Sequence, residues 1–374
     1  MNGMAKHAVA CAALLCVCGA ANAQSSVTMY GRVDAGMDSP RSGGSSVNRL
    51  VSGGSAGSNL GFSRRGGLGR GGLAAVFRLE MGINLDDGTL GQGGRAFGRE
   101  ASVGLSDARF GTLQMGRIPS VLHGPEQCGR LRLGRRRRAA RAHQKRQPPP
   151  RSARCCRWGC RRGRTTRSTT CSPRWGGIEF RGQYSFGENS TTIGRGYGAS
   201  ARYQAGGFDL NAGFQRQEGP DDAAGKVSAM VVGGSYDARF AKFFLGMTVE
   251  KNSCATCTGA IARMPGASTS EFRLTNLGVR VPFGQFTAVA QFTRVNDRSD
   301  YTALTGNRDA NWISLGGDYD LSKRTRLYFG VGQISNKNGS QYVLGTGTAQ
   351  APAMLVGSSS GSSRNIYMGV RHNF

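Results

Sequence analysis

The stretch Asn365-Ile-Tyr-Met-Gly-Val-Arg-His-Asn-Phe374 decides the class of fold. Side chains on an extended chain alternate between two faces, so its residues divide into two sets. The mainly apolar set is Ile366, Met368, Val370, His372 and Phe374. The mainly polar set is Tyr367, Gly369, Arg371 and Asn373. This period of two predicts a strand between unlike media. An ordinary amphipathic strand of a soluble protein would show the same pattern.

The same alternation recurs along the chain before this stretch. Segments of ~8 to 10 residues are typical of transmembrane barrel strands, whose signal per segment is weak. The apolar sets include Val27 to Ala35, Leu73 to Met81, Ile178 to Phe186, Tyr197 to Tyr203, Phe208 to Phe214, Phe243 to Val249, Leu277 to Val281, Phe286 to Phe292, Ile313 to Tyr319 and Leu327 to Val331, each taken at every second residue.

A soluble β-sandwich would also alternate, but two features favour a membrane barrel. Charged residues lie in mid-strand, where a water-filled lumen can solvate them, and Tyr or Phe often ends the apolar face, as in an interfacial girdle. Short turns such as 320–325 contrast with long polar loops near 37–58, 251–270, 296–311 and 335–363. The sequence therefore predicts an all-β fold, a transmembrane antiparallel β-barrel with short turns on one side and long loops on the other.

The first 23 residues have the pattern of a secretory signal peptide. A basic start containing Lys6 precedes an uncharged stretch from Ala8 to Ala21, and Ala21-Asn22-Ala23 fits a cleavage site. We expect residues 24–374 to form a single barrel domain outside the cytoplasm. No later stretch reaches the ~18 apolar residues of a membrane helix, so only a closed barrel would satisfy the backbone in lipid.

Several motifs together resemble the trimeric general porins of Gram-negative outer membranes. They are 28–36 (TMYGRVDAG), 88–99 (GTLGQGGRAFGR) with 101–105 (ASVGL), 111–117 (GTLQMGR), 319–325 (YDLSKRT) and 369–374 (GVRHNF). The resemblance implies a homotrimer of barrels of about 16 strands in the bacterial outer membrane, each with a water-filled pore. It also implies a third loop that folds inward after the fifth strand, with acidic groups facing basic groups on the wall. Such a protein would contact outer-membrane lipid and lipopolysaccharide, and Phe374 in the C-terminal strand would be read by the barrel assembly machinery.

Residues 121–175 depart from this pattern. They hold seventeen basic residues, sixteen of them Arg, against the single acid Glu126, and so carry most of the formal charge of +27. With no period-two apolar face, this Arg/Cys/Pro-rich segment takes the place of the expected constriction loop and sixth strand. Our hypothesis for about residues 118–176 is a reading-frame slip in GC-rich DNA, later restored, which resequencing that DNA would test. An alternative is a secreted or surface β-protein that binds polyanions through this segment.

No catalytic constellation stands out, so the sequence predicts no enzyme activity, no cofactor and no nucleic-acid partner. Cys254 and Cys257 form a lone C-x-x-C in an expected external loop. A zinc site needs further ligands at workable spacing, which the four scattered His residues do not offer, so we predict no metal. A small loop disulfide between these two cysteines is the preferred interpretation.

Alternation also assigns charged side chains to the lumen. Eight arginines against five acids predict a weakly positive lumen and a weak preference for anions. Arg32 and Arg78 rank first among them because they face the expected constriction, and Arg117 is added at the entrance of the third loop. The lumen candidates are Arg32, Arg78, Arg181, Arg202, Arg273, Arg280, Arg326 and Arg371, against Asp34, Glu80, Glu179, Asp209 and Asp318.

Overall fold

A computed structural model describes residues 27–68, 72–123, 167–187, 194–219, 225–254, 268–300, 308–345 and 361–374. Within these ranges the chain is built of antiparallel strands, with one four-residue helix, α2 (Gly91–Gly94), between two of them. No helix in the described part of the chain is long and apolar enough to cross a bilayer. The strands are β1 (Thr28–Ser42), β2 (Ser45–Ser46), β3 (Arg49–Ser52), β4 (Asn59–Gly67), β5 (Ala74–Gly82), β6 (Glu100–Asp107), β7 (Gly111–Arg117), β8 (Arg167–Cys171), β9 (Ile178–Ser185), β10 (Gly196–Ala205), β11 (Phe208–Glu218), β12 (Lys226–Asp237), β13 (Lys242–Asn252), β14 (Ser270–Phe283), β15 (Phe286–Asp297), β16 (Ala310–Asp320), β17 (Thr325–Asn336) and β18 (Ser362–Asn373).

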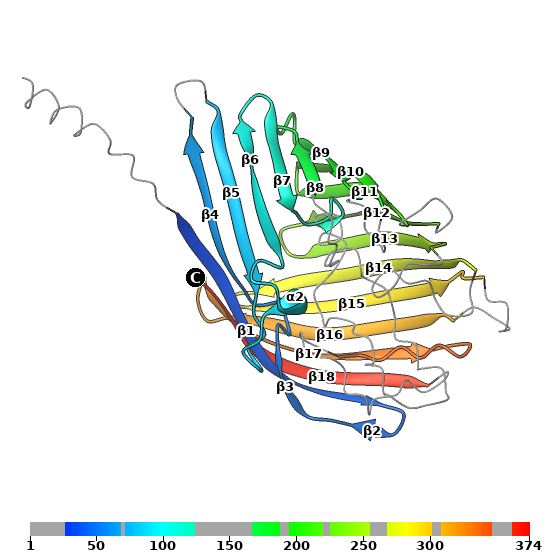
Figure 1. The fold of residues 1–374 in the computed structure, drawn as a ribbon. Coiled ribbons are helices and arrows are strands. Elements are labelled where there is room, and N and C mark those ends of the chain that lie inside the picture. Colours follow the sequence, from blue (N-terminus) through cyan, green and yellow to red (C-terminus); the bar gives the residue numbers. More distant parts are fainter. Residues whose placement is uncertain are drawn as a thin grey trace, which may run out of the picture.

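The strands close into a barrel of 16 positions. From β4 to β18 each strand pairs with the next in sequence, and β18 returns to pair with β1 from Arg32↔Asn373 to Ser42↔Ser363. β4, β3 and β2 pair with successive parts of β1, so together they fill one position in the ring. Figure 1 shows β1 beside β18, with the C-terminus next to β1. A closed ring leaves no sheet edge unpaired, as a lipid environment requires.

Burial alternates along the strands as the sequence predicts. In β11, the apolar Leu210 and Phe214 are 45% and 40% exposed on the outer face, whereas Gln215 and Gln217 are 3% and 5% exposed on the inner face. In the long strands β10 to β18 most Met, Leu and Phe residues point outward and most Ser, Asn and Gln residues point inward, apart from a set of inward apolar residues that includes Phe272 and Leu274. The barrel therefore presents an apolar outside and a polar lumen.

Turn chemistry explains the short connections. Gly206 and Gly207, between β10 and β11, have φ of +56° and +83°. Positive φ at both central residues defines the type I′ hairpin turn, which matches strand twist and is readily formed by glycine. Gly176 and Gly177, between β8 and β9, form a second such pair at the same end of the barrel, whereas Gly43 and Gly44, between β1 and β2, form one at the end with the long connections.

One strand corrects the sequence analysis. We expected the Arg/Cys/Pro-rich segment 121–175 to replace the sixth strand, but β8 fills the sixth position of the ring and pairs with both β7 and β9. Its outward residues are Ser168 and Thr170, so it lacks the row of apolar side chains by which the other strands were predicted from the sequence. Thr nevertheless favours extended backbone, and pairing on both sides satisfies the main chain.

Candidate functional site in the barrel lumen

Two of the predicted lumen arginines form ion pairs on β9 to β11. Arg202 Nε and Nη2 donate to the two carboxylate oxygens of Asp209 at 2.8 and 2.6 Å, a bidentate arrangement. Arg181 Nη2 lies 2.6 Å from Glu179 Oε1. Arg202 also faces Glu179 across the β9–β10 pair, so the four residues form one continuous patch near the short turns.

A second network joins β14, β16 and β17. Asp318 Oδ2 lies 2.6 Å from Arg280 Nη2 and 2.9 Å from Arg326 Nη1. Arg326 Nη2 also donates to Asp320 Oδ2 at 2.6 Å. The two arginines and two carboxylates therefore neutralise each other, and this patch adds little net charge to the lumen.

A third patch lies on β1, β5 and β6. Tyr30 Oη donates to Glu80 Oε2 at 3.0 Å, and Arg99, at the end of the loop after β5, forms an ion pair with Glu80. Arg78 Nη1 lies 3.5 Å from Glu100 Oε2, and its side chain is 51% exposed. Arg78 is thus the most water-accessible of the paired lumen arginines described so far.

Arg32 and Arg371 differ from the other predicted lumen arginines. Arg32 Nε donates to Asn373 Oδ1 at 3.0 Å, and Arg371 Nη1 donates to Ser55 Oγ at 3.0 Å. Among the described residues, neither has a carboxylate oxygen within 4.0 Å. These two neighbouring cations therefore stand next to neutral partners.

Asp34 is on an inward-facing position but does not line water, because it is 0% exposed. Residues 53–58, between β3 and β4, cover it, and they bring Ser55 beside Arg371. From the sequence we expected Asp34 to be a lumen charge and this segment to belong to an external loop; the cover formed by residues 53–58 corrects both expectations.

The chain after β7 turns into the lumen, as the resemblance implied. Arg167 Nη1 donates to the carbonyl of Ile118, Gln183 Nε2 donates to the carbonyl of Pro119, and Ser120 Oγ donates to Gln215 Oε1. Residues 118–123 therefore run along the inner wall across β8, β9 and β11.

Two apolar side chains anchor that segment. Val121 and Leu122 are 2% and 0% exposed and pack with inward residues of β12. A Cβ on Gly213 of β11 would lie 2.7 Å from Leu122 Cδ2, so the wall is glycine where the segment docks. Arg117, at its start, donates from Nε to the carbonyl of Gly98 at 2.7 Å, which ties it to the loop after β5.

A further inward segment was missed by the sequence analysis. Tyr342 and Leu344, at 4% and 5% exposed, pack with inward-facing Phe272, Trp312 and other apolar residues of β14 to β17. Asn336 clamps the backbone of Tyr342, donating from Nδ2 to its carbonyl and accepting from its amide. The sequence did contain a signal for this segment, namely the apolar residues on the inward rows near the long-loop end. Such residues are not expected on the wall of a water-filled lumen unless another part of the chain covers them.

Arg273 corrects the lumen assignment. It shares the outward row of β14 with Leu277, which is 49% exposed, and it lies close to the long-loop end of that strand. There its Nη2 is 2.8 Å from Glu271 Oε1, and Lys251 Nζ is 3.6 Å from Glu271 Oε2. Water at the rim solvates these charges, so the outward row tolerates them beyond the apolar band.

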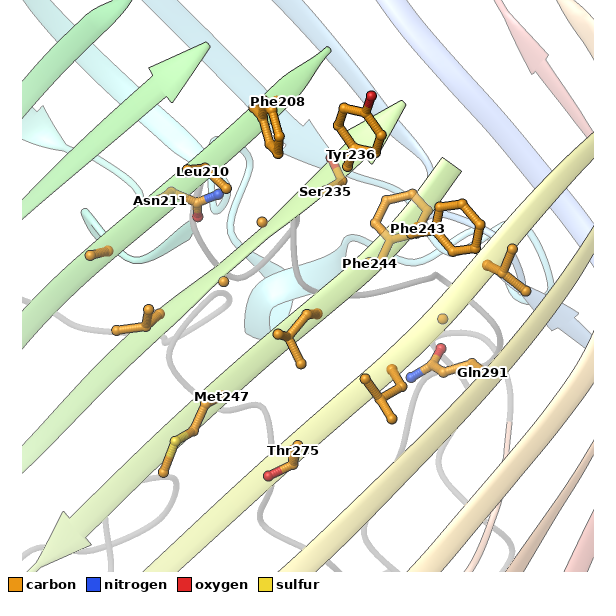
Figure 2. Close-up of a pocket in the computed structure, with 18 of the residues that line it drawn as sticks. Phe208, Leu210, Asn211, Ser235, Tyr236, Phe243, Phe244, Met247, Thr275 and Gln291 are labelled. Atoms are coloured by element: carbon orange, nitrogen blue, oxygen red, sulfur yellow. The ribbon is translucent and has the colours of Figure 1, made fainter. Parts of the chain in front are cut away.

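The outer wall carries an apolar hollow of about 1410 Å³ over β9 to β16. Figure 2 shows Phe208, Tyr236 and Phe243 gathered at one end of it, next to the short turns. The rings of Phe208 and Tyr236 lie 4.6 Å apart between centroids. Aromatic side chains at strand ends are typical of the membrane–water interface, so the aromatic end of this hollow is expected to lie at that interface.

The remaining predicted residues are only partly described. Cys254 is disulfide-bonded, whereas Cys257 lies outside the described residues, as do the signal segment and residues 124–166. The backbone of Phe374 exchanges two hydrogen bonds of 3.1 Å with Gly31, which closes the seam beside β1. Over the described ranges, no group of three or more His, Cys, Asp and Glu side chains could hold a metal ion.

Comparisons with known proteins agree with this architecture. The Gram-negative porin family matches residues 8–126 and 155–339. Outer membrane porin protein 32 of Delftia acidovorans is 28% identical over 391 residues, covering 99% of this chain and 100% of that protein. An outer membrane porin of Bordetella pertussis is 27% identical over 387 residues, covering 87% of this chain and 93% of that protein.

Solved structures share the fold. The anion-selective porin from Comamonas acidovorans superposes with a TM-score of 0.74 at 23% identity, over 94% of this chain and 100% of that one. Family and fold indicate a channel rather than an enzyme. The chain belongs to the Gram-negative porin family, and its barrel is a passive channel of the outer membrane.

Proposed function

We propose that this porin is weakly anion-selective and that Arg32 and Arg371 produce the preference. The observation that carries the proposal is the pairing pattern: the predicted wall acids Glu80, Glu179 and Asp318 each have an arginine partner, and Asp34 is covered. Of the arginines predicted to line the lumen, Arg32 and Arg371 have no carboxylate oxygen within 4.0 Å among the described residues.

The size of the effect follows from Coulomb's law. A unit charge about 4 Å from an anion is worth roughly 1 kcal/mol in water, or roughly a fivefold change in local concentration. Salt screens this attraction, with a Debye length of about 10 Å at 0.1 M and about 3 Å at 1 M. The preference is therefore expected to be modest and to weaken as salt rises. The related porin from Comamonas acidovorans is described as anion-selective, which supports the same sign here.

The test is the reversal potential of purified channels in planar bilayers under a KCl gradient. We expect the parent channel to favour chloride, and the double variant R32Q/R371Q to lose most of that preference. R273Q is the matched control, because it removes the same charge from the outward face. Clear cation selectivity of the parent, or an equal shift in R273Q, would overturn the proposal.

We also propose the assembly and surroundings of the protein. The family suggests outer-membrane trimers, and exposed apolar residues on β1 and β18, such as Met37 and Met368 at 57% and 58%, offer an outward face that a second copy or lipid can cover. The rim ion pairs around Glu271 lie at the long-loop end, where lipopolysaccharide phosphates would meet cations. Phe374 in the C-terminal strand is the residue for recognition by the assembly machinery. Light scattering of the detergent-solubilised protein would test the trimer, and a monomeric mass would contradict it.

A further inference from the structure

Residues 53–58 are held against the inner wall by one buried carboxylate. Asp34 Oδ2 accepts a hydrogen bond of 2.6 Å from the amide of Ala56, and Oδ1 accepts one of 3.4 Å from the amide of Ser55. The amide of Gly53 donates to the Asp34 carbonyl at 2.7 Å, and Ser58 Oγ accepts from the Asp34 amide at 3.0 Å. Both the backbone and the side chain of one residue thus bind this segment.

Tyr328 of β17 completes the attachment from the opposite side of the seam. Its Oη donates to Asp34 Oδ1 at 2.7 Å, and the tyrosine is only 4% exposed. A Cβ on Gly36, Gly54 or Gly369 would overlap this hydroxyl. Glycines of the wall and of the segment therefore enclose the ring between them, and replacing any of the three would displace it.

The segment in turn contacts the channel arginines. Ser55 Oγ accepts from Arg371 Nη1 at 3.0 Å. The charged groups that act on Arg371 include Asp318, Asp34 and Asp320, which attract its guanidinium, and Arg326 and Arg32, which repel it. Without the contact to Ser55, attraction would draw the guanidinium toward Asp318 and Asp320, where its charge would be neutralised.

We infer that Asp34 is a positioning residue for permeation: it fixes residues 53–58 so that Ser55 holds Arg371 away from Asp318 and Asp320. This inference rests on the proposed anion preference. It assigns to a negative side chain the unexpected role of maintaining a positive lumen. Arg371 keeps its charge available to passing anions only while the segment stays attached.

The direction in which D34N changes the anion preference distinguishes a positioning role of Asp34 from that of an acid that simply lines the lumen. If Asp34 acted as an ordinary lumen charge, D34N would raise anion preference by removing a negative charge. If Asp34 positions Arg371, D34N releases the segment and lowers anion preference. We expect the lowered preference, measured as a reversal potential at 0.1 M KCl, with the shift largely lost at 1 M, where screening is stronger.

Because D34N removes charge from a buried site and can impair folding, two milder variants test the same contact. Y328F deletes only the hydroxyl that donates to Asp34, and S55A deletes only the oxygen that accepts from Arg371. We expect both to shift the reversal potential in the direction of R371Q and by less. S314A is the matched control, a buried inward serine of β16, and should leave the potential unchanged.

The outcomes distinguish the two proposals. A parent channel without anion preference, or one that R371Q leaves unchanged, contradicts the proposed function. A normal response to R371Q, with no shift in S55A and Y328F or with higher anion preference in D34N, contradicts only the role of Asp34.

Discussion

Replacing Leu122 by Ala should loosen the entrance of the third loop from the wall. Leu122 is 0% exposed and rests on Gly213 of β11 beside inward residues of β12. Burying a leucine is worth about 1.5–3 kcal/mol, and Leu→Ala changes in packed sites cost about 2–5 kcal/mol. A loss of about 2 kcal/mol would raise the undocked fraction of residues 118–123 roughly thirtyfold.

Single-channel recording in planar bilayers is the assay. We expect L122A to show more open-channel current noise and more brief closures than the parent, because the hydrogen bonds of Pro119 and Ser120 remain while the apolar anchor is lost. L277A is the matched control, since this leucine lies on the lipid-facing row of β14. If L122A folds and records like the parent, docking of this segment does not depend on Leu122, and the reasoning is refuted.

Two further predictions concern the seam and a loop. G31A should destabilise the barrel by about 1–3 kcal/mol, because a Cβ there would overlap the Phe374 ring and lie 2.8 Å from the Asn59 carbonyl oxygen. A lower heat-unfolding temperature in gel shift would show it, and unchanged stability would exclude the overlap. In the loop after β5, hydrogen bonds from the Thr89 hydroxyl and amide lower the pKa of Asp87. This contact therefore stabilises the loop fully at a pH above the ordinary pKa of a carboxyl group. The stabilisation is lost as the pH falls through the lowered pKa. T89A should raise that pKa in an NMR titration, with the amide keeping it below its ordinary value, and an unchanged pKa would contradict the assignment.

Alternation predicted the strands, and mid-strand charges, aromatic strand ends and connections of unequal length favoured a membrane barrel over a soluble sandwich. Strands such as β11 carry mainly apolar residues on the outer face and polar residues on the inner face, because lipid favours apolar side chains and water favours polar ones. The same rule misses β8, where Ser168 and Thr170 occupy the outward row and pairing with neighbours supplies the stability. Arg273 shows the limit at strand ends, where water at the rim accepts charge on either face.

The lumen was less accessible to sequence reasoning than the wall. Period two finds the inward rows, but it does not show which charges are paired or covered, and this is why Asp34 was counted with the exposed acids. Loops that fold inward carry no periodic signal at all. Their only trace is isolated apolar residues such as Leu122 and Leu344 in otherwise polar connections. The frame-slip hypothesis and the anion preference stay predictions.

The separation between strands and inward segments has an evolutionary consequence. The number of strands sets the circumference of the barrel, whereas residues 53–58, 118–123 and 337–345 occupy space inside it. Substitutions in these short stretches can therefore change the bore and its charge without altering the rows that lipid selects. A porin built this way can acquire a new permeability while its membrane-facing surface, and the requirements of its insertion, stay the same.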